Sequence, residues 1–343
     1  MSQQITEAFV QQYSANVFHL SQQQGSRFRP RVRNESQVGK TAYYDRIGLV
    51  TAQLKTGRHS STPQLDTPHS RRAVSLSDYE WADLVDDEDK IRLLNDPTSE
   101  YAIAAMWSMG RAMDSVVIAA ATGTAYTGEA GATSTVLPVT QKIGAVASTA
   151  QSDLNVATLR KVKRIMDAAE VDPSLKRYMA VTAKQIEALL GQTEVTSSDY
   201  NTVKALAQGD INTFLGFEFI HSERLALQTT ATLAINTTTG VISAGSSMTG
   251  TIRKCFAWAE NGLLLSIGAD MKAKIGERAD KSYAMQVYAC MSLGAVRMEE
   301  EKEVEVFVQA DQNPKEDKQD KKKVILPSEK FLHLVAEKTG LSP

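Results

Sequence analysis

The net charge of the chain changes sign abruptly within its first hundred residues. Between Arg27 and Arg72 lie ten lysines or arginines and three carboxylates, whereas Asp78 to Glu100 contains nine carboxylates and two basic residues. Segments of opposite charge attract each other and set the register of an interface. The pattern predicts an extended basic segment that lies against an acidic surface, either within one chain or between identical copies. The alternative is a basic loop that is merely solvated.

The basic segment has the pattern of a long hairpin. Residues 42–49 and 48–54 favour strands, and Gly57, Pro63 and Pro68 mark a tip. A two-stranded hairpin has too little surface to form a core of its own. We therefore expect it to lie on another surface, for which the acidic segment is the first candidate.

A long helix is predicted to follow the acidic segment, at residues 97–122. Asp96 can cap this helix, Pro97 suits its first turn, and Gly123 is a plausible stop. The apolar stripe that repeats at three- and four-residue steps predicts its buried face: Ile103, Met106, Trp107, Gly110, Met113, Val117 and Ala121.

The same helix is nearly apolar enough for a membrane span. Residues 101–121 are about the length that crosses a bilayer. Arg111 and Asp114 lie near the middle, where each would cost about 2.5 to 3.5 kcal/mol. We therefore expect a helix that packs inside a soluble protein.

Helices and strands alternate in the second half of the chain, which favours a second compact α/β unit. The predicted elements are a helix at 155–169, a strand at 177–182, a helix at 183–190 and a strand at 216–220. A surface hairpin around Gly240 is predicted at 225–245, and Asn261-Gly262 marks a tight turn within the apolar run 255–267.

Two further strands are predicted in 283–307, separated by Gly294. The last of them alternates valines with glutamates, which predicts one buried face and one mostly solvated face. Its alternating residues are Glu303, Val304, Glu305, Val306 and Val308.

Both ends of the chain have segments that cannot be stable alone. Apolar residues between Phe9 and Leu20 have helical spacing. The pattern predicts a charged linker at 311–323 and a short amphipathic helix at 328–338. Such segments need a surface to cover, as expected of a protein that its neighbours complete.

Few residues suggest catalysis or metal binding. Cys255 and Cys290 lack the spacing of a zinc site, and Gly39-Lys40-Thr41 lacks the first glycine of a phosphate-binding loop. No catalytic residue, cofactor site or metal site is predicted. The formal net charge of -2 gives no overall attraction to nucleic acid or membranes. The polar N-terminus lacks the apolar stretch of a signal peptide, so we expect the chain to stay in a reducing cytoplasm.

The order of these elements resembles that of the major capsid proteins of tailed bacteriophages. An N-terminal arm, an extended loop, an acidic lead-in, a long spine helix and a compact α/β unit follow one another as in that family. The likeness rests on the joint order of these strings: Ser198-Asp199-Tyr200, Phe214-Leu215-Gly216-Phe217, Cys255-Phe256-Ala257-Trp258-Ala259, Asp280-Lys281-Ser282 and Gly294-Ala295-Val296-Arg297. It covers about residues 1–308.

The resemblance implies an α+β fold, the phage major capsid fold of the Hong Kong type. Its expected parts are an N-terminal arm at 1–33, an extended basic loop at 34–80, a peripheral domain at 81–175 with the spine helix at 97–122, an axial domain at 176–270, return strands of the peripheral domain at 271–308, and a charged linker with a C-terminal helix at 309–343.

The resemblance also implies a structural role in the virion and no enzymatic one. Hexamers and pentamers of the chain would form an icosahedral shell around double-stranded DNA, which is held without sequence specificity, and the shell would be assembled in the host cytoplasm. Scaffold, portal and decoration proteins would be further partners, and a membrane would not. The charge pattern predicts inter-subunit contacts at Arg46, Lys55, Arg58, Arg71, Arg72, Asp83, Asp86, Asp87, Glu88 and Asp89.

Two other functions stay open at this point. An encapsulin-like nanocompartment shell would share the fold and store an enzyme cargo in place of DNA. A soluble enzyme would assemble its site from scattered residues such as His221, Glu223 and Asp210. Portal and terminase genes beside this one would decide for a phage, and saturable small-molecule binding to a monomer would decide for an enzyme.

Overall fold

The computed structural model describes residues 21–55, 57–58, 62, 64–86, 98–147, 150–151, 153–192, 213–228, 233–235, 242–248 and 251–310. The predicted helical arm at 9–20, the charged linker, the C-terminal helix and the acidic residues Asp87, Glu88 and Asp89 lie outside them. Within the described residues, no helix is both long and apolar enough to cross a membrane.

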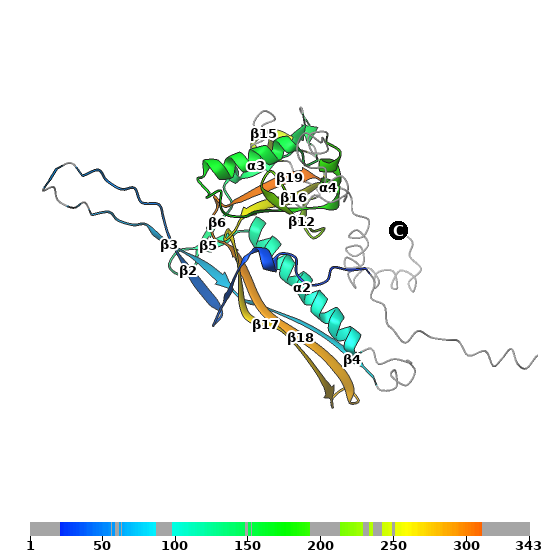
Figure 1. Cartoon of the computed structure of the whole chain (residues 1–343). Helices are drawn as coiled ribbons and strands as arrows, with labels where there is room; N and C mark the ends of the chain where they lie inside the picture. Colours follow the sequence, from blue (N-terminus) through cyan, green and yellow to red (C-terminus); the bar gives the residue numbers. More distant parts are fainter. Residues whose placement is uncertain are drawn as a thin grey trace, which may run out of the picture.

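A four-stranded sheet and a long helix form one half of the molecule (Figure 1). The strand order is β1 (Arg33–Ser36), β17 (Leu263–Arg278), β18 (Ala284–Arg297) and β4 (Ser77–Val85). Helix α2 (Thr98–Thr122) packs along this sheet, which confirms the predicted long helix. Because β1 and β4 come from the start of the chain and β17 and β18 from its end, the sheet joins distant parts of the sequence.

The predicted buried stripe of α2 is correct at its C-terminal half only. Met113, Val117 and Ala121 are buried, whereas Ile103 is 41% exposed. The buried face instead begins at Ala105 and Met109 and includes the following residues: Gly110, Met113, Asp114, Val117, Ile118 and Ala121. The stripe is rotated because the N-terminal segment of the chain also packs on this helix.

Asp114 fixes that N-terminal segment to α2. Its side chain is fully buried and accepts hydrogen bonds from the backbone N–H of Arg27 at 3.1 Å and of Phe28 at 3.2 Å. One turn earlier, a Cβ on Gly110 would lie 2.5 Å from the carbonyl carbon of Gly25. The carboxylate of Asp114, one of the two charges that argued against a membrane span, therefore binds the backbone of residues 27–28.

A seven-stranded sheet forms the other half. Its order is β11 (Thr213–Phe214), β12 (Phe217–His221), β10 (Arg177–Val181), β16 (Ile252–Ala259), β19 (Glu303–Gln309) and β7 (Lys142–Gly144), and β13 (Leu227–Gln228) also pairs with β16. Helix α3 (Val156–Ala168) contacts β19 and β7. With α4 (Ala183–Leu190), these elements confirm the predicted helices, strands and second α/β unit. One core cluster contains buried residues of both large sheets.

Three smaller groups of strands complete the fold. A third sheet has the order β2 (Thr41–Ile47), β3 (His69–Ser75), β5 (Ala125–Thr127) and β6 (Thr133–Thr135). Strands β14 (Leu233–Ile235) and β15 (Ile242–Met248) pair antiparallel, as the predicted hairpin requires. Strands β8 (Val146–Ala147) and β9 (Ala150–Gln151) pair with each other, and short 3-10 helices lie at η2 (Arg29–Arg31) and η3 (Val139–Gln141).

The two large sheets are joined by two crossings that lie side by side. One crossing is residues 260–262 between β16 and β17, where Asn261 has a positive φ of 66° as the predicted tight turn requires. The other is residues 298–302 between β18 and β19. The Met298 N–H donates to the Gly262 carbonyl at 2.8 Å, and the Ala259 N–H donates to the Lys302 carbonyl at 2.9 Å.

The predicted break at Gly294 is wrong, because β18 runs through this residue and ends at Arg297. A Cβ at Gly294 would lie 2.4 Å from the carbonyl oxygen of Ser75. The glycine thus allows the end of β3 to pass close to the sheet. The break between the two strands falls instead at residues 298–302.

The predicted solvated face of the last strand is also wrong. Glu303 and Glu305 are buried, with exposed fractions of 0% and 1%. β19 is an interior strand of the seven-stranded sheet, and Glu303 and Glu305 lie opposite Trp258 and Phe256 of β16. Phe28 of the N-terminal segment stacks on both of those aromatic rings and covers that face. The alternation of valine and glutamate in the strand cannot predict that Phe28, far away in the sequence, covers this face.

The expected parts differ from the sheets. β7 and α3, within the 81–175 part, and β19, within the 271–308 part, belong to the seven-stranded sheet and its cover. β17 begins at Leu263, within the 176–270 part, but belongs to the four-stranded sheet. β19 pairs with β16 and β7, whereas β17 and β18 form the other sheet.

Candidate assembly surface

A hairpin arm projects from the body of the molecule (Figure 1). Strands β2 and β3 pair antiparallel from Thr41↔Ser75 to Ile47↔His69, and the Gly48 N–H donates to the Pro68 carbonyl at 2.8 Å. The predicted hairpin is confirmed, but its second strand is β3 and residues 48–54 form no strand. Pro68, whose carbonyl accepts the Gly48 N–H, has no N–H of its own to continue the ladder beyond this pair. We call residues 48–68 the arm.

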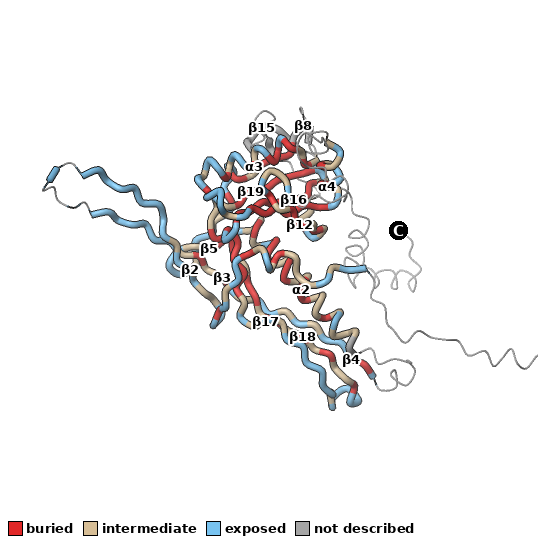
Figure 2. Tube along the Cα trace, in the orientation of Figure 1, coloured by how far each residue is buried: buried red, intermediate tan, exposed pale blue. Residues whose placement is uncertain are grey.

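The arm is exposed along its described residues (Figure 2), and it has apolar side chains without a core to hold them. Every described residue from Gly48 to Pro68 is exposed. Leu49 is 87% exposed and Leu54 is 90% exposed, and Val50 and Leu65 are exposed as well. Apolar groups gathered on one projecting segment mark a binding surface more often than scattered ones do.

The basic residues of the hairpin separate into three groups. On the arm, Lys55 and Arg58 are exposed and form no ion pair within the described part of the chain. Arg71, on β3, pairs with Asp45 at 3.0 Å and lies 5.8 Å from the ring centre of Tyr43. Arg46 and Arg72 instead point into the body. Only the first group and Arg71 are therefore accessible to a neighbouring molecule.

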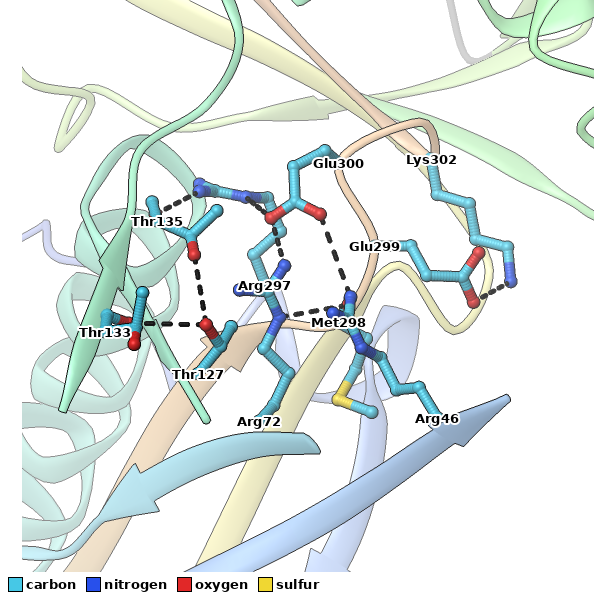
Figure 3. A network of polar contacts seen from close by, with 10 residues as sticks. All are labelled: Arg46, Arg72, Thr127, Thr133, Thr135, Arg297, Met298, Glu299, Glu300 and Lys302. Atoms are coloured by element: carbon cyan, nitrogen blue, oxygen red, sulfur yellow. Dashed lines mark hydrogen bonds and ion pairs between the residues drawn. The ribbon is translucent and has the colours of Figure 1, made fainter. Parts of the chain in front are cut away.

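Arg46 and Arg72 hold the base of the hairpin to the crossing at 298–302 (Figure 3). Arg72 is fully buried, pairs with Glu300 and donates from Nε to the Met298 carbonyl at 3.3 Å. Arg46 donates to the same carbonyl and lies 3.7 Å from Glu300. Burial lowers the pKa of the Arg72 guanidinium from its ordinary value, and Glu300 opposes that shift. One carboxylate thus compensates two arginines of the hairpin.

Arg297 extends this network to the end of α2. It is fully buried and donates to the carbonyls of Ala121 at 2.9 Å and Gly123 at 3.1 Å, at the C-terminal end of the helix. A cation favours the partial negative charge at this end of the helix dipole. Its Nε lies 3.8 Å from Glu300, so the ends of α2, β18 and the hairpin meet at one carboxylate.

The predicted pairing of the basic hairpin with the acidic segment does not occur within the described residues. Asp83 lies on β4 and Asp86 follows it, and both are exposed. Arg46 and Arg72 contact Glu300 instead of either aspartate. The sequence reasoning missed Glu300 and Arg297, although the charged run at 297–302 interrupts two apolar strands and was the available signal.

The alternative enzyme residues have structural contacts. His221 Nε2 lies 3.0 Å from Glu223, and the same Glu223 oxygen accepts the Ala183 N–H at the start of α4 at 2.7 Å. The hydrogen bond from His221 lowers the pKa of Glu223 below its ordinary value. Arg27 covers the other ring nitrogen of His221 at 3.1 Å. Asp210 lies outside the described residues, and within the residues described no three side chains form a metal-binding group.

A polar hollow of about 730 Å³ opens at the base of the hairpin. Arg46, Arg71, His69, Glu129 and Glu300 line it. Arg46 pairs with Glu300 and Arg71 pairs with Asp45 at the hairpin base, so the hollow adjoins the network of Figure 3.

Comparison with known proteins gives one consistent result. A family model described as phage capsid protein matches residues 5–309. Similar solved structures include the capsid of cyanophage P-SCSP1u (TM-score 0.66, 16% identity, 90% of this chain and 95% of that chain covered) and the capsid of Ralstonia phage GP4 (0.67, 10%, 89% and 96%). The head structure of Helicobacter pylori bacteriophage KHP40 is also similar (0.64, 10%, 90% and 98%). At these identities the structures show the fold alone. A search of curated proteins finds no match.

Proposed function

Since the chain belongs to the phage capsid protein family and is a major capsid protein that forms the head shell, we propose that its arm lies on the neighbouring copy within rings of six and five subunits. The fold is the α+β phage major capsid fold. Copies of the chain assemble into a multi-subunit shell, and the chain is a structural protein located in the virion.

The exposed arm is the observation that supports this proposal. Leu49 and Leu54 are almost fully solvated in the isolated subunit. Burying one such side chain contributes about 1.5 to 3 kcal/mol. A neighbouring copy supplies the surface that the arm cannot form for itself. The ion pair between Arg72 and Glu300 fixes the base of the hairpin to the subunit, so that the arm projects from a defined position.

The accessible charges are assigned to contacts between copies as well. Lys55, Arg58 and Arg71 on the hairpin, together with Asp83 and Asp86, are exposed or half-exposed. Charge across such an interface sets register and partner choice more than affinity. Arg46 and Arg72 are excluded from this role, because they are used within the subunit.

We also propose how the copies form a closed head and which other molecules take part. Hexamers and pentamers form an icosahedral head around double-stranded DNA, and assembly takes place in the host cytoplasm with scaffold, portal and decoration proteins as further partners. A formal net charge of -2 suits an inner surface that does not hold packed DNA irreversibly. In this proposal the four-stranded sheet with α2 is the peripheral domain, and the seven-stranded sheet with α3 and α4 is the axial domain.

The proposal is tested by removing the apolar character of the arm. The double substitution Leu49→Ser and Leu54→Ser is expected to leave the subunit's melting temperature unchanged and to abolish closed shells, as measured by sedimentation and negative-stain electron microscopy. Val38→Ser is the matched control, because Val38 is 99% exposed but lies between β1 and β2, off the arm. Normal shells from the arm variant would refute the proposed contact.

A further inference from the structure

The four-stranded sheet has two free edges. β4 forms one edge along its whole length, because among the described strands it pairs with β18 alone. At the other edge β1 covers β17 only from Leu264 to Ile267. Residues 268–278 of β17 have no further partner strand within the described residues. Free strand edges are sites where a second chain can pair unless charge or shape prevents it.

The β4 edge is acidic. Ser77 to Asp86 contains Asp78, Glu80, Asp83 and Asp86 and no basic residue, and all four carboxylates are exposed. Asp78 accepts a hydrogen bond from Ser292, and Glu80 accepts one from Tyr288 at 3.4 Å. Within the part of the chain that is described, none of the four is in an ion pair. The whole edge is thus uncompensated negative charge.

The free part of the β17 edge is basic. The carboxylates Asp270 and Asp280 already pair with Arg29 and Arg278 at 2.7 and 2.6 Å. The other exposed charges of residues 268–281 are Lys272, Lys274, Glu277 and Lys281. The three lysines form no ion pair among the described residues, so this edge has an uncompensated positive charge.

The register aligns the two edges. Glu80 lies opposite Cys290 and Lys272 opposite the same Cys290, so the glutamate and the lysine share one row across the sheet. Residues directly opposite one another also share a face. Ala289 and Met291 of β18 are buried in the core, which places Glu80 and Lys272 on the other, open face.

The strand directions permit the same alignment between copies. β4 and β17 both run antiparallel to β18 and therefore run in the same direction. An identical sheet placed alongside presents its β17 edge parallel to β4, with Lys272 level with Glu80. Two β4 edges placed together would repel each other, so charge permits only the head-to-tail arrangement.

We propose that the acidic β4 edge of each subunit lies against the basic 268–281 edge of the next copy around a capsomer. This contact rests on the proposed function and adds a second surface to the arm. It joins two different patches, and such heterologous contacts close into rings when the rotation between copies permits.

Charge reversal and rescue in the full chain test the contact. Glu80→Lys, Asp83→Lys and Asp86→Lys form one variant, and Lys272→Glu, Lys274→Glu and Lys281→Glu form the other. Each alone is expected to lower the yield of closed shells by about tenfold or more, because like charges then face each other. The six changes combined restore complementary edges and are expected to return the yield to within about twofold.

A mixture of the two single-edge variants gives a sharper outcome. One variant has two basic edges and the other has two acidic edges, so only alternating rings satisfy every contact. Rings of six can alternate, whereas rings of five must contain one like-charged contact. The mixture is therefore expected to form hexamers and open or tubular assemblies and to be depleted in closed shells.

The controls separate this contact from net charge and from the function itself. Arg160→Glu, Lys163→Glu and Arg164→Glu reverse three exposed charges on α3 and are expected to leave the shell yield unchanged. An equal loss in this control, or a combined variant that melts normally yet forms no shells, would overturn the edge contact. An unchanged chain that forms no shells would instead contradict the proposed function.

Discussion

The tip and the base of the hairpin arm use the same kind of residue for different purposes. At the base, Arg72 is completely buried and paired with Glu300, whereas on the arm Lys55 and Arg58 are exposed and have no ion pair among the described residues. Burial decides what a charge contributes: a buried pair is costly to break, and an exposed charge contributes little to the subunit. We therefore expect the base to govern subunit stability and the tip to govern assembly.

The largest effect on the subunit is expected from Glu300→Ala. This change leaves Arg72 and Arg297 buried beside each other without their carboxylate. Removing one partner of a buried ion pair costs about 3 to 5 kcal/mol of unfolding free energy. Chemical denaturation measures the loss, with the exposed neighbour Glu301→Ala as control. Equal stability of the two variants would show that the ion pair does not anchor the hairpin.

Gly110→Ala tests a second anchor, that of the N-terminal segment on α2. The added Cβ would lie 2.5 Å from the Gly25 carbonyl carbon, so the segment must shift, at a cost of about 1 to 3 kcal/mol. Ala119→Leu, on the exposed face of the same helix, is expected to change the melting temperature little. An unchanged melting temperature in Gly110→Ala would mean that the N-terminal segment does not pack closely on α2 at this position.

A smaller effect of opposite sign is expected from Glu303→Gln, next to the hairpin base. Both Glu303 oxygens are buried without a hydrogen-bond partner, and burial raises the pKa of this carboxyl well above its ordinary value. The native state then binds the proton more tightly than the unfolded state does, so stability falls as the pH rises above the unfolded value of about 4.3. The amide should be the more stable variant at pH 7, and this advantage should shrink toward pH 4. Parallel pH curves for the two proteins would contradict it.

The smallest effect on the subunit is expected at the tip. Lys55→Glu with Arg58→Glu should leave the melting temperature unchanged, because both side chains are exposed. The same variant should lower the yield of shells, as measured by sedimentation. A lower melting temperature would show that the tip contacts its own subunit, and the distinction between tip and base would then be lost.

The sequence predicted those elements that local signals define. The long helix has a periodic pattern and a stop at Gly123. α3 begins at Val156 after the N-cap residue Asn155, whose side chain accepts the Thr158 N–H at 2.7 Å. The arm was also predictable, since Gly57, Pro63 and Pro68 are local turn signals.

The remaining features depend on contacts between distant residues. The burial of Glu303 and Glu305 requires Phe28, and the role of Arg72 requires Glu300, which lies far along the chain. A basic run has the same composition whether its arginines are solvated or buried. The acidic and basic sheet edges likewise become visible only when the strand order is known, because β4 and β17 are far apart in the sequence.

The pairing of the chain's beginning with its end has a consequence for when a subunit becomes able to assemble. β1 can pair only after β17 has been synthesised, and β4 only after β18, which ends at Arg297. Pairing over such long separations is slow to form. While the ribosome is still making the chain, β4 has no partner strand and Glu300 has not yet been added to hold the arm. If the proposed contacts join the copies, a nascent chain is expected to become competent for assembly only after synthesis has passed Glu300.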